Sequence, residues 1–217
     1  MSGETSIQQI GNIVVRVRNP EDSNQSRLLI MLHGWTGDEN SMWIFSSRIP
    51  KDYFLVAPRG ITSTPLGGYG WQNATSRGWP AADDFRTAIE TVLDLVDKID
   101  YPKMDRAKFD LMGFSQGAAL AYTIGLTYPD RVGKLAGLSG FLPEGLDDGI
   151  ARGPLLGKKV FVAHGRQDEM VPVSKARQVV EGLKEAKAEV IYCEEDVGHK
   201  LSSGCFRGMS DYFTKLS

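Results

Sequence analysis

The sequence predicts an α/β fold in which a mostly parallel central sheet carries helices on both faces. Short apolar runs alternate along the chain with segments of helical period, the pattern of such a sheet. These runs are apolar along nearly their whole length, which is typical of strands buried on both faces. The 217 residues, 41% apolar and 24% charged, are enough for one large core and short for two. We therefore expect a single domain over residues 1–217.

The strands are predicted from apolar runs rich in β-branched and aromatic residues. Six of them have the character of buried strands: 28–32, 53–57, 109–112, 134–138, 160–163 and 189–192. A further run at 13–17 is expected to form an additional strand at one edge of the sheet. Connections long enough for helices separate the later strands, as a parallel arrangement requires.

Helices are predicted between these strands. The segment 83–99 places Phe85, Ile89 and Val92 at helical spacing, and 115–128 is rich in Ala and Gly, as a helix packed against a sheet would be. The remaining predicted helices are 174–186 and 206–216. Two long segments, 59–80 and 142–157, fit neither period, and long irregular loops in a compact domain are usually functional or disordered. The aromatic residues of the first indicate the wall of a site.

Composition excludes several classes of function. A net charge of −2 does not favour nucleic acid, and no run approaches the roughly 18 apolar residues of a spanning helix, so we expect no stable membrane insertion. No basic and then apolar leader is evident at the N-terminus. Cys193 and Cys205 are expected to be buried or partly buried thiols in a cytoplasmic protein. With no spaced Cys/His cluster, we expect no metal and no cofactor.

The sharpest local motif is Gly113-Phe-Ser-Gln-Gly117. It follows a predicted strand and begins a helix of small residues, which is the setting of a nucleophile elbow. Glycines two positions on either side of Ser115 remove the Cβ atoms that would block so sharp a turn. The turn would expose the hydroxyl and set the backbone N–H of Gln116 at a helix N-terminus, where it can bind an oxyanion.

A serine hydroxyl needs a base, and histidine is the usual one. His199 follows the last predicted strand and precedes the last helix, so it is our candidate. His33 and His164 end predicted strands and are expected to bond loop backbone. Asp168, after the strand 160–163, is the expected orienting carboxylate, with Glu169, Asp147 and Asp148 as rivals. The order Ser115, Asp168, His199 is the chain order of one class of serine hydrolase.

The second oxyanion donor is expected in the loop after the strand 28–32, where Trp35 follows His33-Gly34 and offers its N–H. The Trp35 side chain is equally compatible with an acyl-site wall or the core. The candidate substrate-binding residues are Trp35, Tyr69, Trp71, Trp79, Phe141, Met170 and Val171.

Several motifs in order resemble the phospholipase/carboxylesterase family, which includes the acyl-protein thioesterases. They are Leu32-His-Gly34, Gly113-Phe-Ser-Gln-Gly117, Leu138-Ser-Gly-Phe-Leu-Pro143, His164-Gly-x-x-Asp168 with Val171-Pro172, and Gly198-His199. The resemblance runs from about residue 28 to the C-terminus. It implies an α/β-hydrolase fold with minimal or no lid domain, and a triad of Ser115, Asp168 and His199. The chain departs from the usual His-Gly-Leu-Gly of the thioesterases at His33-Gly-Trp-Thr36, and its segment 60–80 also differs.

We therefore expect a serine carboxylesterase acting on small-molecule esters or thioesters of small to medium acyl chains. Lysophospholipase and acyl-protein thioesterase activities are the alternatives, and an acyltransferase or a peptidase would use the same triad. A non-catalytic binding protein with the same fold is the alternative of a different class. An apolar rim around the site is equally compatible with substrate guidance or a homodimer contact.

Overall fold

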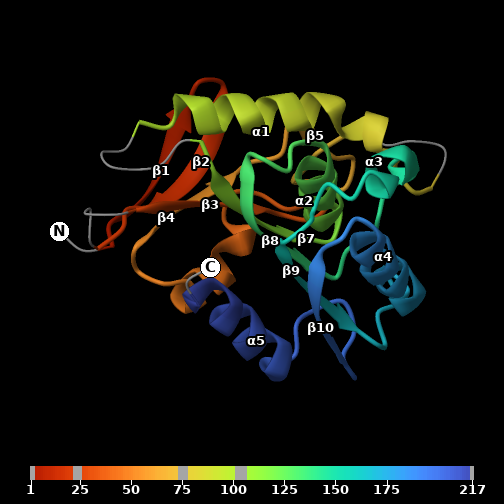
Figure 1. The fold of residues 1–217 in the computed structure, drawn as a ribbon. Helices are drawn as coiled ribbons and strands as arrows, with labels where there is room; N and C mark the ends of the chain where they lie inside the picture. The colour runs from red at the N-terminus through yellow and green to blue at the C-terminus, as the bar shows by residue number, and fades with distance from the viewer. Residues whose placement is uncertain (1–2, 22–25, 73–77, 101–106, 216–217) are drawn as a thin grey trace.

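The computed structural model describes residues 3–21, 26–72, 78–100 and 107–215 (Figure 1). Its main sheet is mixed but mostly parallel: β1 and β4 run antiparallel to β2, and the other neighbours are parallel. In spatial order the strands are β1 (Thr5–Ile10), β2 (Ile13–Arg18), β4 (Tyr53–Pro58), β3 (Arg27–Leu32), β7 (Phe109–Phe114), β8 (Val132–Leu138), β9 (Lys159–Gly165) and β10 (Glu189–Glu195).

Helices cover both faces of this sheet, as predicted. The 3-10 helix η1 (Ser41–Arg48) and α5 (Ser203–Thr214) bury their apolar residues in the core on one face. The helices packed in the core on the opposite face are α1 (Arg86–Lys98), α2 (Gln116–Thr127), α3 (Asp147–Ala151) and α4 (Val173–Glu185), together with η2 (Ala82–Phe85). In Figure 1, α1 and α5 accordingly lie on opposite sides of the sheet.

Three expectations about single elements need correction. The run 13–17 is not an edge strand, because β1 pairs along the whole of β2; β1 has almost every side chain exposed and so gave no apolar pattern. The segment 59–80 contains a small hairpin of β5 (Thr62–Ser63) and β6 (Tyr69–Gly70), while its residues 73–77 lie outside the described part, as does residue 216 of the last predicted helix. The segment 142–157 contains α3.

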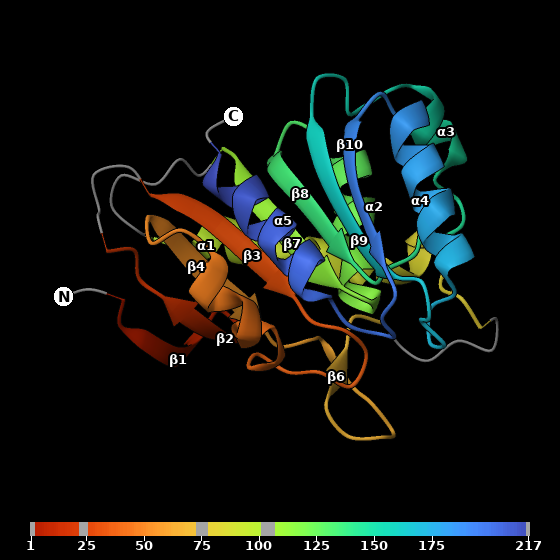
Figure 2. The same ribbon diagram turned by 90° about the horizontal axis from the view of Figure 1, so that it is seen from below.

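The strand order brings two loops together. β3 and β7 are parallel neighbours in the sheet. From β3 the chain continues to β4 on one side, and from β7 it continues to β8 on the other side. Ligand sites of open α/β sheets lie at such a reversal, beyond the carboxyl ends of the strands. In Figure 2, the short strand β6 lies beyond this end of the sheet.

Candidate active site

Ser115 occupies a sharp turn between β7 and α2. Its backbone has φ +53° and ψ −115°, a positive φ that non-glycine residues seldom adopt and that clusters at functional sites. A Cβ on Gly113 would lie 2.1 Å from the carbonyl oxygen of Gly117, and one on Gly117 would lie 2.2 Å from that of Leu32. Both glycines are therefore required by close backbone packing, as the sequence motif predicted.

The turn is held from the neighbouring strand and from the helix. The Ser115 N–H donates to the Leu138 carbonyl at 2.8 Å, and the Ser115 carbonyl accepts from Ala118 N at 3.0 Å. The N–H of Gln116 lies in the first turn of α2, where a helix offers no carbonyl to accept it. The Gln116 side chain is turned toward the aromatic loop (residues 59–80, of which 73–77 are not described), since its Oε1 accepts the N–H of Trp71 at 2.9 Å.

Asp168 and His199 lie on loops that follow neighbouring parallel strands, β9 and β10. Nδ1 of His199 is 2.7 Å from Oδ2 of Asp168. The other carboxylate oxygen accepts the N–H groups of Met170 and Val171 at 2.9 and 2.8 Å. The Asp168 side chain is fully buried and that of His199 is 22% exposed. This arrangement fixes the imidazole with Nδ1 protonated and leaves Nε2 as the basic nitrogen.

The rival carboxylates lie elsewhere. Glu169 is exposed next to Asp168, and Asp147 and Asp148 are exposed in the first turn of α3. Of the sequence-predicted acids, Asp168 is the one that meets His199.

The structure shows no direct bond between Ser115 and His199, although the residue before the serine contacts the histidine. Among the described residues, no hydrogen bond joins the Ser115 hydroxyl to the His199 ring. The Phe114 ring, one residue before the serine, has its centroid 4.9 Å from that of His199. Catalytic hydrogen bonds often tighten only once substrate is bound, so this open geometry is compatible with the roles expected from the sequence.

The other two histidines bind loop backbone, as expected. His33 lies 2.7 Å from the Gly34 carbonyl through Nδ1, and its Nε2 accepts the Gly60 N–H at 2.8 Å. His164 donates through Nε2 to the Val171 carbonyl at 2.8 Å. Burial lowers the pKa of both rings, so both are held neutral.

The loop after β3 is shaped by its contacts with His33 and Ser115. Gly37 N donates to the Gly34 carbonyl at 3.1 Å, and Thr36 has a φ of +67°. A Cβ on Gly34 would come within 3.2 Å of the Ser115 Cβ, so this backbone passes directly beside the serine. The loop thus brings Trp35 to the site, where the sequence placed a second oxyanion donor.

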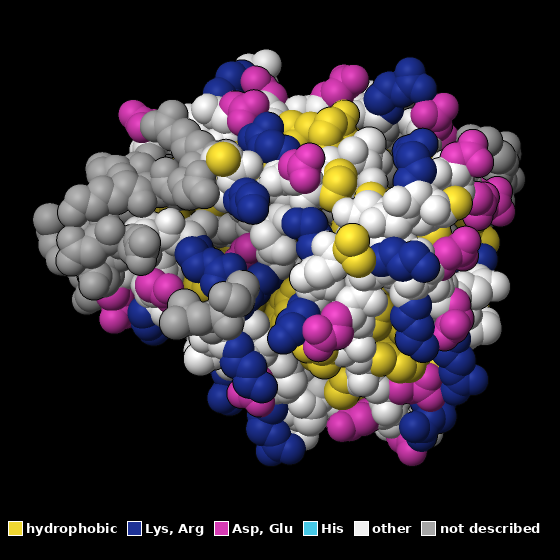
Figure 3. Space-filling view, in the orientation of Figure 1, with side chains coloured by type: hydrophobic (Ala, Val, Ile, Leu, Met, Phe, Trp, Pro, Cys, Tyr) yellow, Lys and Arg dark blue, Asp and Glu magenta, His cyan; other side chains and the backbone are white. Residues whose placement is uncertain are grey.

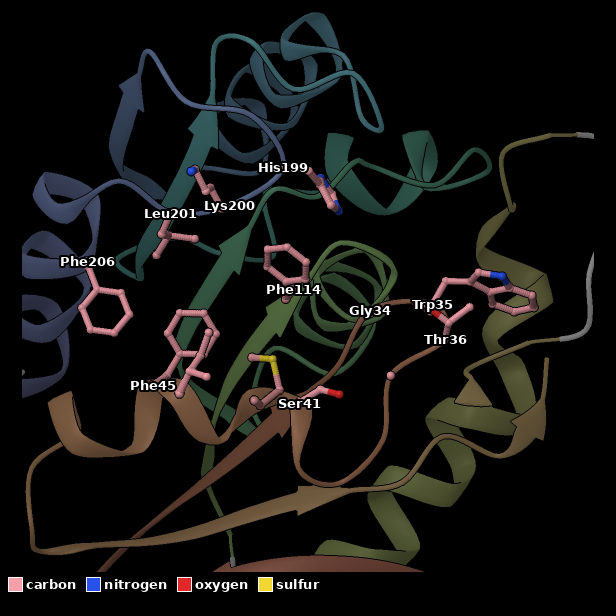
Figure 4. Close-up of a pocket in the computed structure, with 13 residues that line it drawn as sticks. Gly34, Trp35, Thr36, Ser41, Phe45, Phe114, His199, Lys200, Leu201 and Phe206 are labelled. Carbon is pink, nitrogen blue, oxygen red and sulfur yellow. Dashed lines mark hydrogen bonds between the residues drawn. The ribbon is translucent and has the colours of Figure 1, made fainter. Parts of the chain in front are cut away.

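Two pockets border the site, one on the serine side and one on the histidine side. The serine-side pocket, of about 520 Å³, is lined by Trp35, Gln72, Gly78, Trp79, Pro80, Ser115, Gln116, Phe141, Met170 and Val171. The histidine-side pocket, of about 450 Å³, is lined by Gly34, Trp35, Thr36, Gly37, Ser41, Met42, Ile44, Phe45, Phe114, His199, Lys200, Leu201 and Phe206. Trp35 lines both. In Figure 4, its indole points away from the cluster of Phe45, Phe114 and Phe206.

Five of the seven predicted substrate-binding residues line the serine-side pocket: Trp35, Trp79, Phe141, Met170 and Val171. Trp79 packs edge-on against Phe141, with ring centroids 4.7 Å apart. Two predicted residues do not line either pocket. Trp71 is 1% exposed and donates through Nε1 to the His33 carbonyl at 2.7 Å, and Tyr69 lies under the guanidinium of Arg59.

The sequence reasoning missed Gln72 and, apart from Trp35 and His199, all of the histidine-side pocket. Residues 41–48 form a 3-10 helix, and Met42 and Phe45, three positions apart, are its buried residues. That spacing was the one available signal. Phe206 reaches the same pocket from α5, far along the chain, and no local pattern links it to Phe45.

Cys193 and Cys205 form a disulfide, so the expectation of two thiols is wrong. Cys193 belongs to β10 and Cys205 to the first turn of α5, with Cα atoms 5.6 Å apart. Only the packing of α5 beside β10 shows that they meet. The bond joins the two ends of the segment that carries His199. Because disulfides persist mainly in oxidising compartments, the cytoplasmic location stays a prediction that this pairing does not support.

On the face shown in Figure 3, Lys and Arg side chains are interspersed with Asp and Glu, so the described part of this face has no extended patch of one charge sign for a polymer such as nucleic acid. Within the described ranges, no helix has both the length and the apolar character needed to cross a membrane.

The fold and the elbow define the class of protein: this is an α/β-hydrolase. Comparison with known proteins gives the family, because residues 13–217 match the family model described as Phospholipase/Carboxylesterase. The chain belongs to that family and is a hydrolase of the carboxylesterase and acyl-protein thioesterase type, as the sequence motifs predicted.

Individual relatives carry the names of more than one reaction. An acyl-protein thioesterase 1 from Debaryomyces hansenii is 30% identical over 175 residues, 70% of this chain and 74% of the relative. A putative 2-succinyl-6-hydroxy-2,4-cyclohexadiene-1-carboxylate synthase from Bacillus subtilis is 33% identical over 119 residues, but that match covers 53% of this chain and only 37% of the relative. Among solved structures, a Bacillus cereus carboxylesterase has a TM-score of 0.78 at 19% identity, covering 94% of both chains. Acyl-protein thioesterase 2 from Zea mays has a TM-score of 0.71 at 19% identity, covering 98% of both chains. At these identities the structural matches support the fold.

Proposed function

We propose that this protein is a serine carboxylesterase that hydrolyses small-molecule carboxylic esters of small to medium acyl chains. The observation that carries the proposal is the 2.7 Å contact between His199 and the buried carboxylate of Asp168, at the same end of the sheet as the strained Ser115 turn. A pure binding protein has no physical need for this combination.

In the proposed mechanism, Ser115 Oγ attacks the acyl carbonyl carbon while His199 Nε2 takes its proton. The N–H groups of Gln116 and Trp35 hold the oxyanion, and a donor of this kind is typically worth about 3–4 kcal/mol of barrier. The C–O bond to the alcohol then breaks, and His199 returns the proton to the leaving oxygen. Water, deprotonated by the same histidine, attacks the acyl-enzyme and releases the carboxylic acid.

Pocket size supports the expected acyl range. The serine-side pocket, of about 520 Å³, lies within the roughly 300–1,000 Å³ common for small-molecule sites. Thioester hydrolysis is the second candidate, because the Debaryomyces hansenii relative bears the name acyl-protein thioesterase 1. The same triad would expel a thiol in place of an alcohol.

The test is hydrolysis of p-nitrophenyl esters from acetate to palmitate by the wild type and by Ser115→Ala, with fluorophosphonate labelling of both. We expect labelling and turnover in the wild type, neither in the variant, and an optimum at short to medium chains. An optimum at long chains would favour lysophospholipid or acyl-protein substrates. A folded wild type that neither reacts with the probe nor cleaves any ester would overturn the mechanism.

A further inference from the structure

The two pockets differ in which catalytic group they contain. Ser115 and Gln116 line the serine-side pocket, while His199 lines the histidine-side pocket. Trp35 lines both pockets. In Figure 4 its indole points away from the phenylalanine rings of the histidine-side pocket. An ester whose carbonyl carbon lies at Ser115 can therefore place its two arms, the acyl chain and the alcohol group, in two different pockets.

The chemistry assigns those arms. The carbonyl oxygen must face the N–H groups of Gln116 and Trp35, and the leaving oxygen must lie within hydrogen-bond reach of His199, which protonates it. The alcohol arm therefore extends into the histidine-side pocket. The acyl arm takes the remaining direction, toward Trp79 and Phe141 in the serine-side pocket.

Most side chains that line the histidine-side pocket are aromatic or aliphatic, and its polar side chains, besides His199, are Thr36, Ser41 and Lys200. The rings of Phe45 and Phe206 are stacked with centroids 5.4 Å apart, and Met42 is buried in the same core cluster as Phe45. Phe114, Leu201 and Ile44 add to the apolar lining. The volume of about 450 Å³ is well above the ~150 Å³ of an engineered cavity that binds benzene, so it accommodates a ring with room for a substituent.

The charged residues near the histidine-side pocket limit which alcohol groups it can accept. Of the described residues that line this pocket, Lys200 carries the one fixed charge, and the guanidinium of Arg48 lies 5.8 Å from the Phe206 ring centroid. A cation in the lining and a second cation beside one of its rings disfavour a cationic leaving group such as choline. A strongly hydrated polyol would lose water against a lining that is mainly apolar, with Thr36, Ser41 and Lys200 as its polar side chains, so it is less favoured than an alcohol that bears an apolar ring.

We propose that the histidine-side pocket is a leaving-group site for apolar, ring-bearing alcohols, so that the natural substrates are esters of such alcohols. The proposal rests on the proposed esterase function and adds to it the substrate arm that the sequence did not address.

The experiment compares butyrate esters that share one acyl group and differ in the alcohol: ethyl, cyclohexylmethyl and glyceryl. Because the acyl-enzyme is common to all three, differences in kcat/KM report acylation and hence the alcohol site. We expect the cyclohexylmethyl ester to exceed the ethyl ester by at least roughly tenfold, in the range that apolar pockets give for added carbon groups. The glyceryl ester should fall below the ethyl ester.

Variants locate the effect. Phe206→Ala should reduce the cyclohexylmethyl preference severalfold, and Ile44→Ser should reduce it in the same direction at a position that is 69% exposed, where folding is not at risk. Met170→Ser, 71% exposed in the serine-side pocket, should leave the alcohol preference unchanged and alter the acyl preference. Leu156→Ser, 79% exposed and outside both pockets, controls for a surface substitution and should change neither.

Each result decides the matter. Equal kcat/KM for all three butyrates in a protein that still reacts with fluorophosphonate would overturn the alcohol site alone. A ring preference that disappears in Met170→Ser but survives in Phe206→Ala and Ile44→Ser would also overturn it, by reversing the two arms. Loss of both hydrolysis and labelling in the wild type would instead mean that the esterase function itself is wrong, and the alcohol site with it.

Discussion

Nδ1 of His199 and Oδ2 of Asp168 lie 2.7 Å apart across 31 residues of sequence. The carboxylate is fully buried, and its second oxygen is held by two backbone N–H groups. Asp168 therefore has one orientation in which to hold the imidazole, and the ring has one tautomer in which to serve as base.

Replacing Asp168 by Asn should accordingly remove activity while preserving the turn. The amide can present an N–H toward Nδ1, which would reverse the tautomer and leave Nε2 protonated. We expect kcat to fall by roughly ten-thousand-fold, as such replacements do in serine hydrolases. Steady-state kinetics with a p-nitrophenyl ester provides the measurement. Glu169→Gln, exposed at the next position, is the matched control, and an equal loss there would contradict the assignment.

The elbow glycines should tolerate no side chain. In Gly117→Ala the new Cβ would lie 2.2 Å from the Leu32 carbonyl oxygen, and backbone on a central strand cannot move away. We expect a loss of roughly 3 kcal/mol in the free energy of unfolding, the upper end for overpacking, measured by chemical denaturation.

Gly125→Ala in the same helix is the matched control. Its Cβ would lie 2.7 Å from Cδ2 of Leu135, a side-chain end that can rotate, and Ala favours the helix by about 1 kcal/mol over Gly. This variant should lose less than about 1 kcal/mol. Equal losses at both positions would show that the backbone contact is not what requires Gly117.

Much of the sheet and the candidate triad could be predicted because their signals are local. An apolar run indicates a buried strand, and the glycines around Ser115 indicate the sharp turn at the serine. β1 was not predicted, because it is a polar edge strand that is defined by its pairing with β2 and not by its composition. Trp71 shows the converse limit: an aromatic residue in an irregular loop is equally a pocket wall or core until its Nε1 is found against the His33 carbonyl.

Contacts made by the packing of α5 had no signal in the sequence pattern. The stacking of Phe45 on Phe206 joins η1 to α5, and the Cys193–Cys205 bond joins β10 to α5. The first depends on α5 packing beside η1, which forms much earlier in the chain, and the second on α5 folding back beside β10, the strand directly before it. Composition also argued against a disulfide, because two cysteines in an ordinary globular chain are usually thiols.

The two tryptophans of the aromatic loop should now behave differently. Trp71→Ala removes a buried indole and its hydrogen bond to His33, so we expect a loss of roughly 3–5 kcal/mol in stability and similar relative losses of activity at every acyl length. Trp79→Ala should instead shift the chain-length optimum, because Trp79 lines the serine-side pocket. Chemical denaturation and a p-nitrophenyl ester series measure both. A shifted optimum in a stable Trp71→Ala protein would contradict this division.

Acid should destabilise the protein through its buried neutral histidines. Burial lowers the pKa of His33 and His164 below the ordinary 6.5. Below that pH, the unfolded chain takes up protons that the folded protein does not bind, so the free energy of unfolding decreases as pH falls. Glu194 does not contribute in this window, because its ordinary pKa of 4.5 and its folded pKa of about 2, lowered chiefly by the hydrogen bond from Arg177, both lie below it. Denaturation at pH 7.5 and 5.5 should show the decrease.

A variant isolates one of these rings. His164→Gln can still donate an N–H toward the Val171 carbonyl but cannot titrate. It should be less stable than the wild type at pH 7.5 and should lose less stability on going to pH 5.5. A decrease as steep as that of the wild type would assign the acid sensitivity to other groups.

Reduction of the Cys193–Cys205 bond should slow catalysis. The bond closes a segment of 12 residues with His199 at its centre, and links of this length stabilise by roughly 3 kcal/mol in the chain-entropy view. A dithiol such as dithiothreitol would leave two cysteine thiols and its own cyclic disulfide. With the bond open, the His199 loop samples more conformations, so we expect kcat to fall severalfold and the melting temperature to decrease.

The double variant Cys193→Ala/Cys205→Ala should show both effects without reductant and no further response to it. Alkylation of either cysteine in the untreated native protein, or a reduced protein with unchanged kcat, would contradict this role for the disulfide.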